Sequence, residues 1–331
     1  MKGPKIIPVF LSQAGCPGQC IYCLREVVGA GQAVMSRSPE QEVAEACRLF
    51  PDGADEIAFY GGTFTLLEPT RQEAFLQAAA TLRSRGFIQR IRLSTRPDAI
   101  DEETCRRLKA YGVNLVELGV QSLDPVVLKA SGRGYAPACV EQSLRQLQAV
   151  GITVVFQLML GLPEQHWPSV LQTTAETLRL RPAGVRIYPL LVFTGTPLYS
   201  LWQTGRYQAL TLARAVAQAS YWRRAFSDAS IPVYRIGLQL ASQELAKVAA
   251  GPWHASFSSL VKAHDGRRLL DCHLRMQTDD QLRRIMLGKA AALPVRQEKQ
   301  RLEALLAQYP RISLGVHKAG AMLDSNAVLL S

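Results

Sequence analysis

Short apolar runs alternate with longer amphipathic stretches through the first two thirds of the chain, and this rhythm limits the fold more than any other feature. Roughly 10–20 residues with the apolar spacing of a helix separate one run from the next. Strands separated by helices pair in parallel through right-handed crossovers. Strands are expected at Ile6–Leu11, Glu56–Tyr60, Ile88–Ser94, Leu115–Val120, Thr153–Leu160 and Val185–Leu191, and Val233–Leu238 can add one more.

The amphipathic stretches predict the helices. The first has a marked start, because Ser38 suits the N-cap and Pro39 suits the first helical position. This order of elements predicts an α/β fold, a partial or full (β/α) barrel, whose chemistry lies on loops after the C-terminal ends of the strands. The expected helices are Glu40–Phe50, Thr70–Arg85, Glu102–Tyr111, a short one around Val126–Ala130, Pro137–Val150, Trp167–Leu180 and further helices across Leu198–Ala229.

The alternation stops after about Gln239, which predicts a barrel domain over residues 1–239 and a mostly helical, basic region over residues 240–331. Within the second region, Asp279–Leu293 and Arg296–Gln308 have helical spacing and Ile312–Val316 reads as a strand. From Lys262 to Lys318 there are 12 basic and 6 acidic residues. This excess of charge fits either a basic docking surface or a solvated helical face.

The whole chain is basic, with a formal net charge of +11. Of its 38 basic residues, 29 are arginine, whose planar guanidinium suits phosphate. The composition suggests a polyanionic partner such as RNA. The competing interpretation is that codon bias enriches arginine and that the charge affects only solubility and non-specific binding.

No apolar run approaches the ~18–20 residues that span a bilayer. The first residues, Met1–Lys5, lead directly into the first strand without the apolar segment of a secretory signal. We therefore expect a cytoplasmic protein without a membrane partner.

The chain has seven cysteines, an odd number, and three of them lie close together. In a reducing compartment, clustered thiols indicate metal ligands rather than disulfides. The other four have no grouped spacing and are expected to be inert thiols: Cys47, Cys105, Cys139 and Cys272.

The clustered cysteines are Cys16, Cys20 and Cys23, in a loop after the first strand. Three thiolates on a short loop can ligate three irons of a 4Fe-4S cluster and leave the fourth iron open to another molecule. A structural zinc site needs four closed ligands, and no fourth cysteine or histidine lies nearby in the sequence. The spacing therefore favours a cluster over zinc.

This Cys-x3-Cys-x2-Cys spacing, with an aromatic residue before the last cysteine, resembles the signature of the radical S-adenosylmethionine (SAM) superfamily. The fuller set of motifs is similar to the radical SAM domain of the Elongator catalytic subunit family and, more distantly, to oxygen-independent coproporphyrinogen oxidases, over about residues 5–240. The motifs that carry the resemblance are Tyr60–Thr65, Leu93–Asp98, Val116–Ser122, Gly132–Tyr135, Gln157–Pro163, Arg186–Val192, Gly195–Tyr199 and Thr204–Tyr207.

The resemblance implies a barrel of radical SAM type, with one 4Fe-4S cluster on the three cysteines and SAM on the open iron. Arg133 is expected to pair with the SAM carboxylate, since its guanidinium fork suits that group. The other residues expected at the cofactors are Gly61, Gly62 and Thr63 for the amine, Thr95 and Gln121 as polar contacts, Gly161 and Leu162 for adenine, and Tyr22, Arg96 and Gln157. For Thr95, Arg96 and Gln121, structural hydrogen bonding is the competing role.

The chain departs from its relatives in three places. Those relatives usually carry an acidic residue in place of Ser94, and the coproporphyrinogen oxidases carry one in place of Gln157. Both changes bear on the expected ribose contacts. Residues 240–331 do not resemble the acetyltransferase domain of the Elongator proteins, so acetyl-CoA chemistry is not expected.

The implied mechanism is reductive cleavage of SAM, with an electron donor of flavodoxin or ferredoxin type, and hydrogen abstraction by a 5′-deoxyadenosyl radical. Three functions stay open: modification of RNA such as tRNA, reaction on a small molecule (porphyrin-related or other), and non-catalytic nucleic-acid binding on this fold. Candidate substrate contacts are Tyr234, Arg235, Trp253 and His254. For Trp253 and His254 the competing interpretation is a core aromatic and a surface histidine.

Overall fold

Seven parallel strands form one sheet, in which they follow one another in chain order. The computed structural model describes residues 4–11, 16, 20–23 and 37–265 and the backbone of 284–287, 313–316 and 328–330. The strands are β1 (Ile6–Phe10), β2 (Glu56–Tyr60), β3 (Arg90–Thr95), β4 (Val113–Gln121), β5 (Thr153–Leu160), β6 (Gly184–Pro189) and β8 (Val233–Ile236). Because β1 and β8 are the two edges, the sheet is a half-barrel, and the partial form of the predicted barrel is confirmed.

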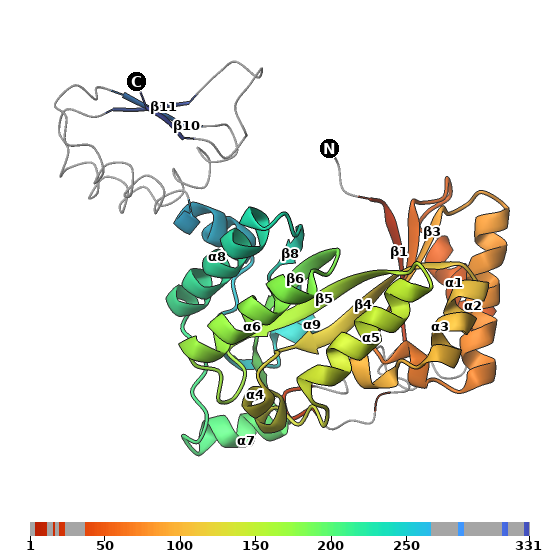
Figure 1. Cartoon of the computed structure of the whole chain (residues 1–331), viewed down its shortest axis with the longest axis horizontal. Coiled ribbons are helices and arrows are strands. Elements are labelled where there is room, and N and C mark those ends of the chain that lie inside the picture. The colour runs from red at the N-terminus through yellow and green to blue at the C-terminus, as the bar shows by residue number, and fades with distance from the viewer. Residues whose placement is uncertain are drawn as a thin grey trace.

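The helices are α1 (Pro39–Cys47), α2 (Pro69–Ser84), α3 (Glu102–Ala110), α4 (Pro125–Ala130), α5 (Pro137–Ala149), α6 (Trp167–Leu180), α7 (Pro197–Gln203), α8 (Leu212–Asp228) and α9 (Ser242–Leu245), with 3-10 turns η2 (Phe64–Leu66) and η3 (Pro97–Ala99). The helices α1, α2, α3, α5, α6 and α8 cover the outer face of the curved sheet (Figure 1), whereas α4 and α7 contribute to a second apolar cluster. The predicted start of α1 is confirmed, since the Ser38 hydroxyl accepts from Gln41 N and the Gln41 side chain accepts from Ser38 N.

Alternation along each strand separates two environments. One set of residues, such as Ile57 and Phe59, is fully buried against the helices in a single apolar core. The intervening residues face the inner side of the half-barrel and include Arg92, Glu117 and Arg186. The inner side is therefore polar and charged. Charged side chains are seldom buried unless they are paired.

The predicted strands and helices up to residue 239 are confirmed to within a few residues at each end. The stretch Leu198–Ala229 divides into α7 and α8, and Gly205 follows α7 with a φ of 72°. Glycine reaches this left-handed conformation without steric cost, which lets the chain leave the helix.

Residues beyond 239 are partly helical. Residues 257–265 are helical, and Phe257 and Val261 join the main core. β9 (Val248–Ala250) pairs antiparallel with β7 (Val192–Phe193). Residues 240–265 thus pack on the half-barrel, and the division at residue 239 stays a prediction.

One predicted helix is wrong where it can be checked. Within Asp279–Leu293, the segment β10 (Arg284–Leu287) is a strand that pairs in parallel with β11 (Ser313–Val316) and antiparallel with β12 (Val328–Leu330). A short apolar run fits a strand or a helix equally well, and pairing with distant segments decides between them. The strand expected at Ile312–Val316 is confirmed, whereas Arg296–Gln308 and most of the basic stretch lie outside the described residues.

No helix among the described residues is long and apolar enough to cross a bilayer.

Candidate cofactor site

The segment from Cys20 to Cys23 is fixed to the end of the sheet where the strands terminate. Ile21 N donates to Ser131 O, which follows α4, over 3.3 Å, and Leu198 N of α7 donates to Ile21 O over 2.9 Å. Cys16, Cys20 and Cys23 are half-buried and form no disulfide among the described residues. The predicted cluster loop therefore lies at the C-terminal edge of the half-barrel, where such folds place their chemistry.

Two guanidinium groups contact the sulfur of Cys20. Arg133 Nη1 lies 3.2 Å from Cys20 Sγ and Arg96 Nη1 lies 3.7 Å from it. Both arginines are about 4% exposed, and both lie over the Tyr135 ring, at 5.0 and 5.5 Å from its centroid. Two buried cations beside a sulfur that is expected to bind metal would offset the negative charge that thiolate ligands carry.

Arg133 is held rigidly by β4. Its Nη2 donates to Gly119 O and lies 2.9 Å from the Tyr135 hydroxyl, which itself donates to Val120 O over 3.0 Å. Burial raises the pKa of Tyr135 to about 12. Tyr135 therefore stays a neutral hydrogen-bonding phenol that fixes the guanidinium, a role that the sequence motif Gly132–Tyr135 did not reveal.

Three expected SAM contacts surround Gly119. A Cβ atom at this glycine would lie 3.0 Å from Gln121 Nε2, 3.5 Å from Thr95 O and 3.6 Å from Arg133 Nη2. Gln121 has a φ of 66°, next to a register shift in the pairing of β4 with β5. Positive φ is uncommon outside glycine and often marks functional positions. The structure thus brings Thr95, Gln121 and Arg133 together, and their roles as SAM contacts stay predictions.

The glycine motif after β2 contributes a buried polar contact to the same region. Gly61 has a φ of 88°, and Thr63 is 3% exposed where the chain enters η2. The Thr65 hydroxyl lies 2.6 Å from the Thr95 hydroxyl. Thr65 was not among the predicted site residues, although it lies in the quoted motif, and its contact places the motif beside β3.

Arg96 also has a structural role. Its Nε and Nη2 donate to the Asp98 carboxylate, each over 2.8 Å, and Nη2 donates to Arg133 O over 2.6 Å. It therefore joins the loop after β3 to the residue that contacts Cys20, as well as contacting that sulfur itself.

The loop after β5 is braced from both sides. The Gln165 side chain accepts from Gly161 N over 2.6 Å and donates to Met159 O over 3.0 Å. The Tyr207 hydroxyl donates to Gly161 O over 2.6 Å, and burial raises the pKa of Tyr207 far above its usual range. Leu162 belongs to a small apolar cluster against which Tyr22 packs, so one apolar cluster involves two residues expected near the cofactors. Gln165 and Tyr207 were not predicted as site residues.

A network of ion pairs occupies the inner face of the sheet. Glu117 is fully buried, and its carboxylate accepts from Arg92 Nη1, Arg186 Nη2 and Gln157 Nε2, each over 3.0 Å. Arg92 also pairs with Glu56. Gln157, expected at the cofactors, therefore donates to Glu117, which lies two residues before Gly119 on the neighbouring strand β4. The signal for this network was a charged residue flanked by apolar ones in the middle of several strands.

The four candidate substrate contacts do not form one group. Tyr234 packs against Gly184, where β6 begins, whereas Arg235 pairs in register with Arg186 and donates to Gln239 Oε1 over 2.9 Å. His254 Nδ1 accepts from Ser256 N over 3.0 Å, before the helix at residues 257–265. The indole N–H of Trp253 is buried without a hydrogen-bond partner among the described residues.

Within the part of the chain that is described, no three Cys, His, Asp or Glu side chains gather closely enough to hold one metal ion. The donor set nevertheless fits an iron–sulfur cluster, because three cysteines that form no disulfide among the described residues lie within eight positions of the sequence, and buried guanidiniums contact one of them. Residues 17–19, between the first two cysteines, lie outside the described residues.

Comparison with known proteins agrees with this geometry. A tRNA uridine(34) acetyltransferase of Dehalococcoides mccartyi (strain CBDB1) is 27% identical over 244 residues, which cover 62% of this chain and 53% of that protein. Elongator complex protein 3 of Danio rerio is 28% identical over 227 residues, covering 59% of this chain and 41% of that one. The chain spans about half the length of these curated relatives.

The fold is similar to a solved structure of Elp3 from the archaeon Methanocaldococcus infernus, with a TM-score of 0.64 and 21% identity over 80% of this chain and 63% of that chain. The model of the radical SAM superfamily matches residues 10–175, and the model of the Radical_SAM C-terminal domain matches residues 182–265. The chain belongs to the radical SAM superfamily, which implies a 4Fe-4S cluster and SAM as its cofactors.

Proposed function

We propose that this enzyme binds a 4Fe-4S cluster on Cys16, Cys20 and Cys23 and cleaves SAM reductively to start a radical reaction on RNA. The observation that supports the cofactor assignment is the contact of Arg133 and Arg96 with Cys20, beside the group around Gly119. When bound, the cluster supplies one electron that splits SAM into methionine and a 5′-deoxyadenosyl radical, which takes a hydrogen atom from the substrate.

The side chains around Gly119 position SAM in this proposal. Arg133 offers a buried, pre-oriented guanidinium to the carboxylate, and Gln121 and Thr95 offer polar contacts beside it. Gly119 leaves the space that this approach requires. The apolar cluster that contains Leu162 and packs against Tyr22 provides the surface for adenine and excludes water from the reacting atoms. A reduced flavodoxin or ferredoxin supplies the electron.

Two observations favour RNA as the substrate class. Two of the curated relatives are named tRNA uridine(34) acetyltransferase, and the chain carries a net charge of +11, mostly through arginine. A small molecule is the second candidate, and the inner ion-pair network supports it. Arg92 and Arg186 each keep a buried Nε without a partner among the described residues, so a small acid inside the half-barrel has donors available.

The cofactor proposal is tested by anaerobic reconstitution with iron and sulfide, followed by SAM and dithionite and measurement of 5′-deoxyadenosine. We expect product from the wild type and none from Cys20→Ala. Cys47→Ala is the matched control, because Cys47 is half-buried and outside the cluster loop. Equal product from wild type and Cys20→Ala contradicts the proposal.

The substrate proposal is tested separately, by adding tRNA or a small carboxylic acid to the same reaction. Faster formation of 5′-deoxyadenosine with tRNA, together with a change in nucleoside mass, supports RNA. If only small carboxylic acids speed the formation of 5′-deoxyadenosine, the substrate is a small molecule and the RNA proposal is wrong.

A further inference from the structure

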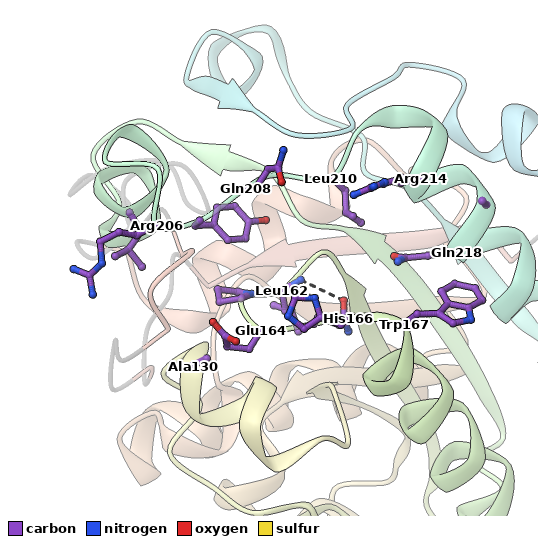
Figure 2. Close-up of a pocket in the computed structure, with 15 residues that line it drawn as sticks. Ala130, Leu162, Glu164, His166, Trp167, Arg206, Gln208, Leu210, Arg214 and Gln218 are labelled. Carbon is purple, nitrogen blue, oxygen red and sulfur yellow. Dashed lines mark hydrogen bonds between the residues drawn. The ribbon is translucent and has the colours of Figure 1, made fainter.

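A cavity of about 660 Å³ lies beside the loop that follows β5, within the size range of ligand sites. Figure 2 shows residues of that loop on one side and residues of the connection into α8 on the other. The first wall includes Leu162, Glu164 and His166, and the second includes Gln208, Leu210 and Arg214. Leu162 also belongs to the apolar cluster against which Tyr22 of the Cys20–Cys23 segment packs, so the cavity adjoins the cluster that supports this segment.

The loop wall is rigid. Gln165 binds Gly161 N and Met159 O through its side chain, and Tyr207 anchors Gly161 O from the opposite wall. Glu164 has a φ of 61°, a conformation that costs energy for a residue other than glycine. A site whose walls are already fixed loses little conformational entropy when a ligand enters.

The lining is cationic and its arginines are available. Arg214 lines the cavity and Arg206 lies at its outer rim (Figure 2). Neither guanidinium forms an ion pair among the described residues, whereas Glu164 is the acidic residue in the lining. A guanidinium without a carboxylate partner suits a phosphate group.

Gln218 of α8 provides an unsatisfied acceptor in the same cavity. Its Oε1 atom is buried and has no hydrogen-bond partner among the described residues. A buried acceptor without a partner is uncommon in proteins, so a ligand that donates an N–H group would satisfy it. A primary amide carries a donor and an acceptor side by side, which lets glutamine pair with the edge of a nucleobase.

We propose that this cavity binds one nucleotide of the RNA substrate, next to the nucleotide that reacts. The base lies against the Leu162–Pro163 wall with its edge on Gln218, and the phosphate lies on Arg214, whereas Arg206 stands on the opposite side of the cavity (Figure 2). Since the apolar cluster that contains Leu162 also packs against Tyr22 of the cysteine segment, a bound neighbour would hold the reactive nucleotide at the barrel mouth. This inference rests on the proposed RNA substrate.

The test uses the reconstituted holoenzyme with SAM and a fluorescein-labelled tRNA anticodon stem-loop, followed by fluorescence anisotropy. We expect Gln218→Leu to weaken binding by roughly tenfold, the size of a lost base contact, and Arg214→Gln to lower the slope of log affinity against log salt by about 1. Arg48→Gln is the control, because it removes the same charge from an exposed pair with Glu45 on α1. Thermal melting checks that each variant is folded.

The outcomes distinguish failure of the proposed nucleotide site from failure of the proposed RNA substrate. If the stem-loop binds and the cavity variants bind it as the wild type and Arg48→Gln do, the nucleotide site is overturned while the RNA substrate stands. If the wild type forms 5′-deoxyadenosine but binds no stem-loop, the RNA substrate is overturned and the nucleotide site with it. Selective loss in both cavity variants supports the inference.

Discussion

Arg133 Nη1 lies 3.2 Å from Cys20 Sγ, although the two residues are 113 positions apart in the chain. The same guanidinium donates to Gly119 O and is held by the Tyr135 hydroxyl. One buried cation thus contacts both the cluster loop and the strand end where SAM is expected. A single side chain can therefore link the loop proposed to hold the cluster to the SAM carboxylate.

Arg133→Lys tests this link while keeping the positive charge. Lysine lacks the planar fork, so it cannot contact Cys20 and Gly119 O together. We expect a normal iron content but 5′-deoxyadenosine formation lowered by about 10- to 100-fold, as for loss of a charged hydrogen bond. Iron analysis and product quantification check this. Exposed Arg145→Lys is the control, and equal rates for Arg133→Lys and the wild type would rule out the proposed role.

Glu117→Gln tests whether the inner network is needed for folding. The substitution leaves two buried guanidiniums, Arg92 and Arg186, without the carboxylate that they share. Removing one partner from a buried ion pair costs about 3–5 kcal/mol. Urea unfolding of the apoprotein should show a loss of this size, whereas Glu45→Gln, in an exposed pair, should change stability by about 1 kcal/mol or less. A loss no larger than that of Glu45→Gln would show that the network is dispensable.

The positions of the strands and of the cysteine loop could be predicted from the sequence, because both depend on local patterns. Apolar alternation located β2 and β5 at their observed bounds, and the same pattern implied that polar residues at strand ends would meet. Thr95, Gln121 and Arg133 do meet around Gly119.

The contacts that were missed depend on register between distant segments. The carboxylate of Glu117 pairs with Arg92 of β3 and Arg186 of β6. No local sequence pattern specifies the strand register that places these three residues next to one another. Tyr207 reaches Gly161 across 46 residues. The strand β10 was predicted as a helix for the same reason, since its partners lie 29 or more residues further along the chain.

Tyr207→Phe tests the brace on the loop after β5. The change leaves the Gly161 carbonyl without its 2.6 Å hydrogen bond in a buried site, which costs about 1–3 kcal/mol. Because Gly161 and Leu162 form the expected adenine contact, we also expect weaker SAM binding in calorimetry. Tyr199→Phe is the control, since its hydroxyl contacts only exposed Gln203 among the described residues. Unchanged SAM affinity in Tyr207→Phe would separate the brace from cofactor binding.

The buried thiol of Cys105 makes stability depend on pH in the alkaline range. Burial, with the Asp101 and Glu102 carboxylates adding to it, raises the pKa of Cys105 to about 11, whereas an unfolded thiol titrates near pH ~8.5. Between these values the folded state binds more protons than the unfolded state, so stability falls as pH rises. Cys105→Ala removes this contribution but leaves a small cavity. We therefore expect its deficit in unfolding free energy, measured with urea under reducing conditions, to be largest near pH 8 and to shrink towards pH 11. A deficit that stays constant across this range would mean that Cys105 does not titrate differently in the two states.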